Sequence, residues 1–253
     1  MKATIVAVSA ALCLLAACGG GGSGSTQGVG NAATGAAAQS TNWSGYVLTG
    51  ALGGFPQVAG SWTVPAVNCA GAGTTASATW AGIGGYGLTD QTLIQAGTEQ
   101  DCGGGNTGYS AWWEGYPLPS VSLSTSSYPV QPGDRISVSI DSSLVVLWTI
   151  KIEDLSAGWT FSKTTAFVSA GQSAEWIEEA PLSISSSGTG QSMLSNFGTV
   201  SFSALTADNK NPALTASGSI VMVNASGDVM AQPSGPGASG DAFDVCYGAG
   251  SCD

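Results

Sequence analysis

The chain has 253 residues, of which 8% are charged, and its 16 Asp and Glu against 5 Lys and Arg give a net charge of -11. This balance excludes the basic surface with which proteins bind nucleic acids. The sequence has no histidine, which excludes Ser-His-Asp and Cys-His catalysis and histidine-ligated zinc. Hydrolytic chemistry would therefore have to use carboxylates, amides or hydroxyls.

Residues 1–17 are predicted to form a signal peptide, because Lys2 precedes an apolar run that is too short to span a bilayer comfortably. The run ends in Leu15-Ala16-Ala17-Cys18 and resembles the lipobox of bacterial lipoproteins, which predicts acylation of Cys18. An ordinary signal peptide cut at a small-residue site is the alternative. Residues 18–40 are predicted to form a lipid-anchored Gly/Ser-rich linker. The expected location is the bacterial cell envelope, at the outer membrane or cell surface, and the alternative is secretion.

Residues 41–232 contain short apolar or alternating runs between turn clusters, the pattern of an antiparallel sandwich or barrel. Glycine, with 38 residues, favours many turns over long helices. Three runs show period two: Ile136, Val138 and Ile140; Leu144, Val146, Trp148, Ile150 and Ile152; and Val200, Phe202 and Ala204. Residues 233–253 are predicted to form a flexible Gly/Ser/Asp tail, held only by its two cysteines.

Four cysteines remain after the predicted cleavage, and an exported chain is expected to form disulfides from them. They allow three pairings. We favour Cys69 with Cys102, because these two flank one segment, and Cys246 with Cys252, because these two close a short terminal loop.

Three predicted strands carry a carboxylate or an amide among apolar and aromatic residues. Gln95 shares a face with Leu93 and Gly97, Glu114 with Trp112 and Tyr116, and Glu175 with Ile177 and Glu179. Such a group either lines a cleft or is a hydrogen-bonded interior group, and spacing alone favours the interior position. Glu178 and Glu179 are predicted to be a solvated pair.

Six segments between residues 41 and 230 form a further pattern. They are Asn42 to Tyr46, Val58 to Pro65, Trp80 to Gly84, Leu93 to Gly97, Tyr109 to Pro117 and Ala174 to Ile177. In order and spacing they resemble the eqolisin family of glutamic peptidases. The resemblance implies an all-β fold, a two-sheet antiparallel β-sandwich of the lectin-like (concanavalin A-like) jelly-roll type with the active site on its concave sheet.

The resemblance also implies site residues. Gln95 and Glu175 would be the catalytic pair, and Trp80 and Glu114 match the family's aromatic and acidic companions near that pair. We predict that Trp80, Trp112, Glu114 and Tyr116 bind the substrate. At Gly84 the sequence departs from fungal members, which tend to have an aspartate there, so the hydrogen bonds that support the site must differ.

A glutamate and an amide can hydrolyse peptide bonds without a metal or cofactor. The glutamate acts as general base on a water, and the amide N–H stabilises the oxyanion. We expect an acid endopeptidase, active at roughly pH 2 to 5, whose lower limit is protonation of Glu175 at its ordinary pKa of about 4.3. The expected partners are protein or peptide substrates and, through Cys18, a membrane, and we expect a monomer.

Two other functions fit parts of the sequence. A carbohydrate-binding module or glycosidase would use Trp112 and Tyr116 for stacking and Glu114 and Glu175 as carboxyls, at roughly 5 to 5.5 Å if it retains configuration. An adhesion or scaffold protein would keep the fold without the chemistry, and the presence of both Gln95 and Glu175 argues against it.

Overall fold

The computed structural model describes residues 37–71, 73–86, 90–144, 146–185 and 188–252. The predicted signal peptide, Cys18 and the linker up to residue 36 lie outside the described residues. Within these ranges, no helix has the length and apolar character needed to cross a membrane.

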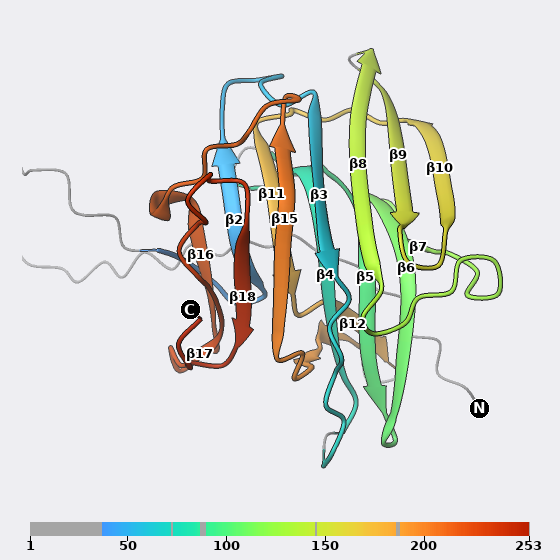
Figure 1. The fold of residues 1–253 in the computed structure, drawn as a ribbon, viewed down its shortest axis with the longest axis vertical. Helices are drawn as coiled ribbons and strands as arrows, with labels where there is room; N and C mark the ends of the chain where they lie inside the picture. Colours follow the sequence, from blue (N-terminus) through green and yellow to red (C-terminus); the bar gives the residue numbers. More distant parts are fainter. Residues whose placement is uncertain (1–36, 72, 87–89, 145, 186–187, 253) are drawn as a thin grey trace, which may run out of the picture.

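The regular secondary structure of the described chain consists almost entirely of strands (Figure 1). In chain order they are β1 (Ala38–Ser40), β2 (Trp43–Thr49), β3 (Gln57–Thr63), β4 (Thr75–Gly84), β5 (Leu93–Gly103), β6 (Asn106–Tyr116), β7 (Val121–Ser122), β8 (Arg135–Leu144), β9 (Leu147–Asp154), β10 (Trp159–Ala166), β11 (Ser173–Glu179), β12 (Leu182–Ser185), β13 (Gly188–Gln191), β14 (Met193–Leu194), β15 (Thr199–Ala207), β16 (Ser219–Val223), β17 (Val229–Pro233) and β18 (Phe243–Tyr247), with the 3-10 helix η1 (Ala216–Gly218) before β16.

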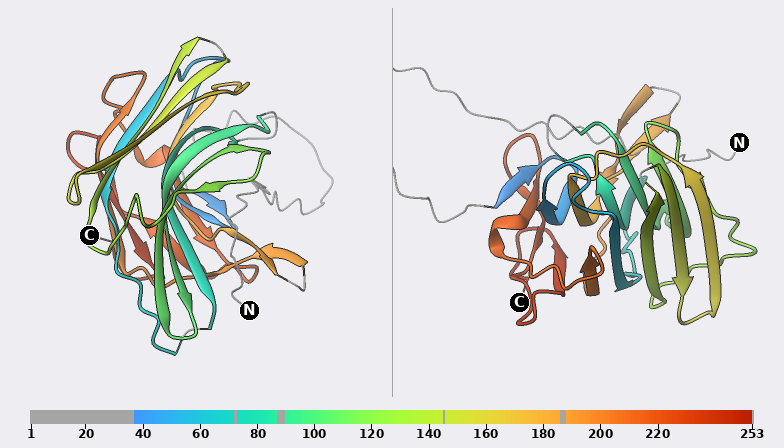
Figure 2. Two further views of the ribbon diagram at one scale, coloured as in Figure 1. Left: turned by 90° about the vertical axis from the view of Figure 1, so that its right-hand side faces the viewer. Right: turned by 90° about the horizontal axis from the view of Figure 1, so that it is seen from above.

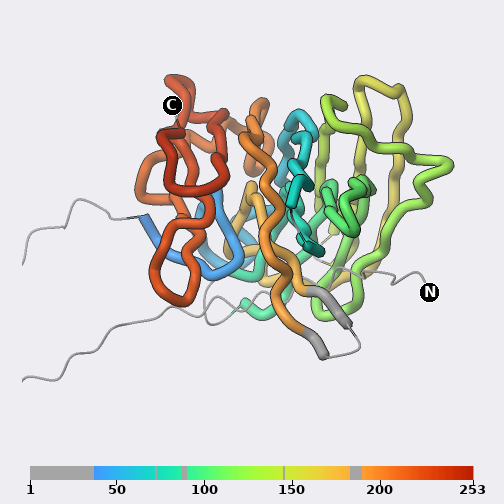
Figure 3. The backbone as a smooth tube through the Cα atoms, turned by 90° about the horizontal axis from the view of Figure 1, so that it is seen from below, coloured from blue at the N-terminus to red at the C-terminus, as the bar shows by residue number. Residues whose placement is uncertain are grey.

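One long sheet folds over to make a two-layer sandwich. Its strand order is β10-β9-β8-β3-β15-β18-β17-β16-β2-β11-β4-β5-β6-β7, and strands that are neighbours along this path are antiparallel, such as β4 with β5 and β3 with β8. The half from β10 to β15, here the β3 layer, faces the half from β2 to β6, the β4 layer, as the side view in Figure 2 shows. Seen from below, β16 to β18 connect the layers (Figure 3). The predicted all-β sandwich is confirmed.

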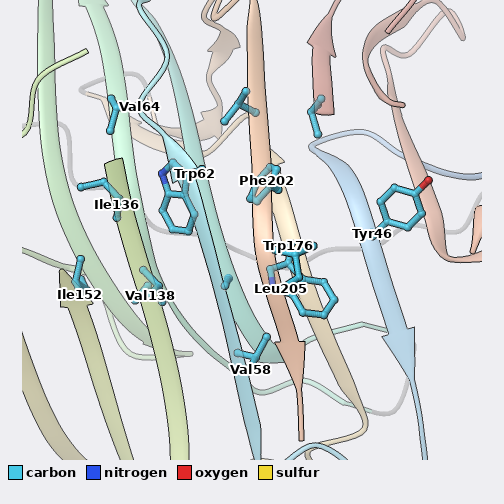
Figure 4. Packing of buried hydrophobic residues seen from close by; sticks show 14 of the residues in the cluster. Tyr46, Val58, Trp62, Val64, Ile136, Val138, Ile152, Trp176, Phe202 and Leu205 are labelled. Carbon is cyan, nitrogen blue, oxygen red and sulfur yellow. The ribbon is translucent and has the colours of Figure 1, made fainter. Parts of the chain in front are cut away.

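The main core lies between the layers. Trp62 of β3, Phe202 of β15 and Trp176 of β11 point into the same space (Figure 4). Each large side chain buried in this way stabilises the fold by roughly 1.5 to 3 kcal/mol. The Trp62 indole also donates a hydrogen bond from Nε1 to Thr98 Oγ1 at 3.0 Å, which ties β3 to β5.

The predicted alternation holds in β8 and β9, where Ile136, Val138, Ile140, Trp148, Ile150 and Ile152 are all buried. The predicted alternation is wrong at one hairpin and at one β-bulge. Leu144 and Val146 are exposed, because the chain reverses between β8 and β9 and the period does not continue across the hairpin. Ala204 is exposed because a bulge interrupts β15, with Ala204 at φ 53°, and Leu205 becomes buried instead.

The predicted flexible tail is also wrong. Residues 233–253 include β18, which pairs with both β15 and β17. Val245 is fully buried, and Phe243 stacks on Phe202 at a centroid distance of 4.8 Å. The apolar residues are only two positions apart inside a Gly- and Ser-rich segment, so their pattern was too short to predict a strand. At the other end, β1 begins inside the predicted linker.

Both favoured disulfides are confirmed. Cys69 is bonded to Cys102, and Cys246 is bonded to Cys252. The first holds the segment before β4 against the end of β5, and the second holds the chain end against β18.

Candidate active site

Four neighbouring strands bring the predicted site residues into one row. Glu175 on β11 lies opposite Gly82 on β4, Gly82 lies opposite Gln95 on β5, and Gln95 lies opposite Glu114 on β6. Directly opposite residues project from the same face of a sheet. Glu175 and Gln95 are therefore separated by two strand spacings, about 9.5 Å between Cα atoms, with only a glycine between them.

Gly82 is needed at its position. A Cβ atom there would lie 2.9 Å from Trp80 Cζ3, 3.0 Å from Leu93 Cδ1 and 3.1 Å from Gln95 Cβ. Any side chain would therefore displace the residues that flank the pair. In the sequence, Gly82 is only one member of the segment Trp80 to Gly84. Its role depends on the strand register, which the sequence alone does not show.

Glu114 holds the Gln95 amide. Gln95 Nε2 donates a hydrogen bond of 2.6 Å to Glu114 Oε2, and both side chains are fully buried. A primary amide has two N–H donors, so one remains for another acceptor after this bond is made. Glu114, predicted as a substrate contact, thus has a structural partner within the row.

Glu175 is fully buried, and neither of its carboxylate oxygens meets hydrogen-bond geometry with another described residue. Burial raises the pKa of Glu175 well above its usual range, the nearby Ser173 hydroxyl counteracts this, and the charge of Asp90 adds to the rise. The ordinary pKa assumed from the sequence is wrong for this environment.

Aromatic residues pack around the row on the outer face of the β4 layer. Trp43 and Trp80 meet edge to face at a centroid distance of 5.0 Å, and the cluster includes Leu93 and Trp112. Trp80 and Trp112 are buried, whereas Tyr116 is partly exposed. The structure thus brings all four predicted substrate-binding residues to the face that carries Gln95 and Glu175.

The expectation that Glu178 and Glu179 are solvated is wrong, because both are fully buried. Glu179 lies on the face of Glu175 and accepts hydrogen bonds from Trp80 Nε1 at 2.8 Å and Asn42 Nδ2 at 3.2 Å. Glu178 points into the core between the layers, where Thr79 Oγ1 donates to its Oε2 at 2.5 Å. Hydrogen-bonding partners from other strands make these positions possible, and the run of charges in the sequence does not reveal them.

Glu114 and Glu175, the two carboxyls of the glycosidase alternative, are separated by three strand spacings, about 14 Å between Cα atoms. Glu114 is hydrogen-bonded to Gln95. Among the described residues, no group of three or more Cys, Asp or Glu side chains is placed to hold a metal ion.

A cavity of about 330 Å³ opens beside this face. Its lining includes Val47, Leu48 and Thr49 of β2, together with Tyr86. Val47 lies directly opposite Glu175 on the neighbouring strand. The volume falls within the range of small-ligand pockets, so the cavity has room for part of a ligand beside β2 and Tyr86.

The fold and this row define a β-sandwich with a buried glutamate–glutamine site. The model of the Peptidase A4 family matches residues 41–240, and the chain belongs to this family. The match begins at the predicted domain start and extends past residue 232 into the segment predicted as a tail.

Named relatives and solved structures agree with this assignment. Aspergillopepsin-2 of Aspergillus niger is 27% identical over 231 residues, covering 82% of this chain and 78% of that protein. Scytalidopepsin B of Scytalidium lignicola is 33% identical over 143 residues, covering 55% of this chain and 51% of that protein. The structure of scytalido-glutamic peptidase with a transition state analog inhibitor has a TM-score of 0.68 at 22% identity, covering 82% of this chain and 98% of that one. For aspergilloglutamic peptidase from Aspergillus niger, the TM-score is 0.53 at 22% identity, with 68% and 99% covered. These structures support the fold.

Proposed function

We propose that this peptidase-family protein is an acid-acting endopeptidase in which Glu175 and Gln95 hydrolyse peptide bonds with an activated water. The observation that carries the proposal is the row in which these two side chains face the same side across Gly82. Glu175 supplies a proton acceptor, and Gln95 supplies an N–H donor that Glu114 holds in place. The similar structure of scytalido-glutamic peptidase, a named peptidase, supports the proposal.

In the first step, water enters between the two side chains and attacks the carbonyl carbon. A Glu175 oxygen takes one water proton as the new C–O bond forms, and the former carbonyl oxygen becomes an oxyanion that accepts from the second Nε2–H of Gln95. Glu114 keeps the amide oriented, because it occupies the first N–H. In the second step the C–N bond breaks, and Glu175 returns the proton to the leaving amine.

Glu175 must be ionised to take a proton, so its raised pKa sets a condition on the mechanism. Entry of water and substrate replaces the dry surroundings that raise the pKa, and the value falls as the site is hydrated. We place the working range at roughly pH 2 to 5, where the unperturbed pKa of a glutamate lies.

The composition fits an acid working range. Beyond the predicted signal peptide the basic side chains are Arg135, Lys151, Lys163 and Lys210. When the carboxylates become protonated, a domain with so few cations carries little positive charge, so self-repulsion does not unfold it.

We propose that the substrate contacts the face formed by Trp80, Trp112, Glu114 and Tyr116, with one side chain in the cavity beside Val47. Of these four residues, Tyr116 is partly exposed. The buried Trp80 and Trp112 pack on the same face of the sheet as Gln95 and Glu175. This arrangement implies that the substrate enters over β2 and Tyr86.

We also propose export and lipid anchoring at Cys18, which rests on the sequence. The two disulfides fit an oxidising compartment. Replacing Cys18 with Ala should release the protein from the membrane fraction or block its processing. Unchanged mass and fractionation would contradict the anchor.

The function is tested by digestion of a denatured protein and of polysaccharides from pH 2 to 7. We expect internal peptide cleavage in the acid range by the wild type, none by Glu175→Gln, and no sugar release. Glu153→Gln is the matched control, because Glu153 is partly exposed in an ion pair with Lys151 on β9. Sugar release without peptide cleavage would overturn the proposal.

A further inference from the structure

Asp90 is a buried carboxylate next to the site that the mechanism above does not use. It lies just before β5 and is only 2% exposed. Its Oδ1 accepts hydrogen bonds from Thr92 N at 3.1 Å and from Thr92 Oγ1 at 2.7 Å. Its Oδ2 is buried and has no hydrogen-bond partner among the described residues. A buried oxygen of this kind is costly to leave without a partner, so its presence calls for a reason beyond the turn.

The free oxygen points to the end of β4. Gly84 has φ +92°, and a Cβ atom there would lie 2.3 Å from Thr92 O and 3.0 Å from Asp90 Oδ2. No side chain can therefore be placed at position 84 without moving the backbone. The space that an aspartate at this position would enter is taken by the carboxylate of Asp90.

The space between Asp90 Oδ2 and Gly84 borders the row formed by Glu175, Gly82, Gln95 and Glu114. Gly84 is two residues beyond Gly82 on the same strand, a distance of about 6.7 Å along β4, and Gly82 lies opposite Glu175. Ser173, two residues before Glu175 on β11, is fully buried. The charge of Asp90 also raises the pKa of Glu175, which agrees with this proximity.

Building on the proposed function, we propose that Asp90 is a positioning residue that acts through Glu175. The Asp90 carboxylate lies in the segment before β5, and its negative charge favours the protonated form of Glu175. Glu175 adopts this form when it takes a proton from water. In the proposed mechanism this form accompanies the tetrahedral intermediate, so the charge of Asp90 stabilises that intermediate relative to the starting state. No additional proton is required, since Glu175 still returns the same proton to the amine.

The other titratable groups on this face belong to neighbouring strands and to the segment after β4. They are Glu179 on β11, Glu99 and Asp101 on β5, Glu114 and Tyr116 on β6, and Tyr86, which packs against the aromatic cluster. Glu114 is bound to Gln95, and Glu179 is bound to Trp80 and Asn42. Asp90 is the group whose charge acts on Glu175, so its removal should change the titration of Glu175 in a specific direction.

The test compares Asp90→Asn with Asp154→Asn. Asp154 is a matched control, because it is also buried and its Oδ1 accepts from the backbone N–H groups of Ser156 and Ala157, but it ends β9 in the β3 layer. Both changes should lower thermal stability. We expect only Asp90→Asn to lower kcat, about tenfold with KM nearly unchanged, and to move the acid limb of kcat/KM to lower pH.

The outcomes separate this inference from the proposed function. An unchanged pH profile and kcat in Asp90→Asn, with Glu175→Gln inactive, overturns the role of Asp90 and leaves the catalytic pair intact. Activity of Glu175→Gln overturns the pair and the role of Asp90 with it. If Asp90→Asn does not fold, Asp90→Ser keeps an acceptor for Thr92 N without the charge, and the same shift is expected.

Discussion

The buried carboxyl of Glu178 should make this protein less stable as the pH rises. Burial raises the pKa of Glu178 to about 8, while hydrogen bonds from Thr79 and Ser77 oppose the rise and the charge of Glu179 adds to it. Between the unfolded and folded pKa values the folded state keeps a proton that the unfolded state has lost. Unfolding therefore releases a proton, and stability falls as the pH rises from about 4.5 to about 8.

The size of the effect follows from the shift. From 4.5 to about 8, at about 1.4 kcal/mol for each unit, the free energy of unfolding loses about 5 kcal/mol. That is a large part of the total stability of a typical domain, about 5 to 15 kcal/mol. Glu178→Gln removes this loss, because an amide oxygen can still accept from Thr79 Oγ1 and the amide does not titrate.

The assay is urea unfolding followed by tryptophan fluorescence at pH 4 and pH 8. The parent protein carries Glu175→Gln to prevent autolysis, and Glu178→Gln and Glu153→Gln are each introduced into this parent. We expect Glu178→Gln to match its parent at pH 4 within about 1 kcal/mol and to be more stable by about 5 kcal/mol at pH 8. Glu153→Gln, which removes a partly exposed ion pair, should change stability by less than about 1 kcal/mol at both pH values. If the difference between Glu178→Gln and its parent does not grow with pH, Glu178 does not carry a raised pKa in the folded state.

Two further predictions concern the row and the disulfides. Gly82→Ala should lower kcat/KM by about 100-fold, because a shift of about 1 Å at the catalytic pair is enough for such a loss. Gly108→Ala should leave kcat/KM unchanged, because the new Cβ would meet only Asp101 Cβ at 3.8 Å. Equal kcat/KM for the two variants in a peptide assay would contradict the role of Gly82. Replacing Cys69 and Cys102 with Ser should lower the free energy of unfolding by about 4 kcal/mol, and replacing Cys246 and Cys252 with Ser should lower it by about 2 kcal/mol. The reason is that the sequence separations are 33 and 6, and a longer closed loop restricts the unfolded chain more. Equal losses in urea unfolding would contradict this order.

The resemblance of six motifs to the eqolisin family predicted the roles of Gln95 and Glu175, whereas alternation only placed these two residues and Glu114 on definite strand faces. On spacing alone, an interior position without a catalytic role was the favoured interpretation. The register between strands could not be predicted in this way, since it depends on the whole sandwich. The position of Gly82 between the pair, and the hydrogen bond from Gln95 to Glu114, follow from that register.

The wrong predictions arise where partners come from distant segments. Glu178 and Glu179 resemble a solvated pair, but Thr79 and Trp80 of β4 supply their hydrogen bonds. The strand β18 is recognisable only beside β15, where Phe243 meets Phe202. Asp90 comes from the segment before β5, so no pattern within one strand connects it with Glu175.

Joint hydrolysis of the peptide bond by Glu175 and Gln95 is tested by kcat/KM at pH 4 on an internally quenched peptide. The wild type, Gln95→Ala, Glu175→Gln and the double variant are compared, each shown to be folded by tryptophan fluorescence. We expect a loss of about 10²–10³-fold for Gln95→Ala and at least as large a loss for Glu175→Gln. The double variant should be about as slow as the slower single one, since residues that act as a unit are not additive. Near-wild-type hydrolysis by either folded single variant would contradict the joint action of Glu175 and Gln95.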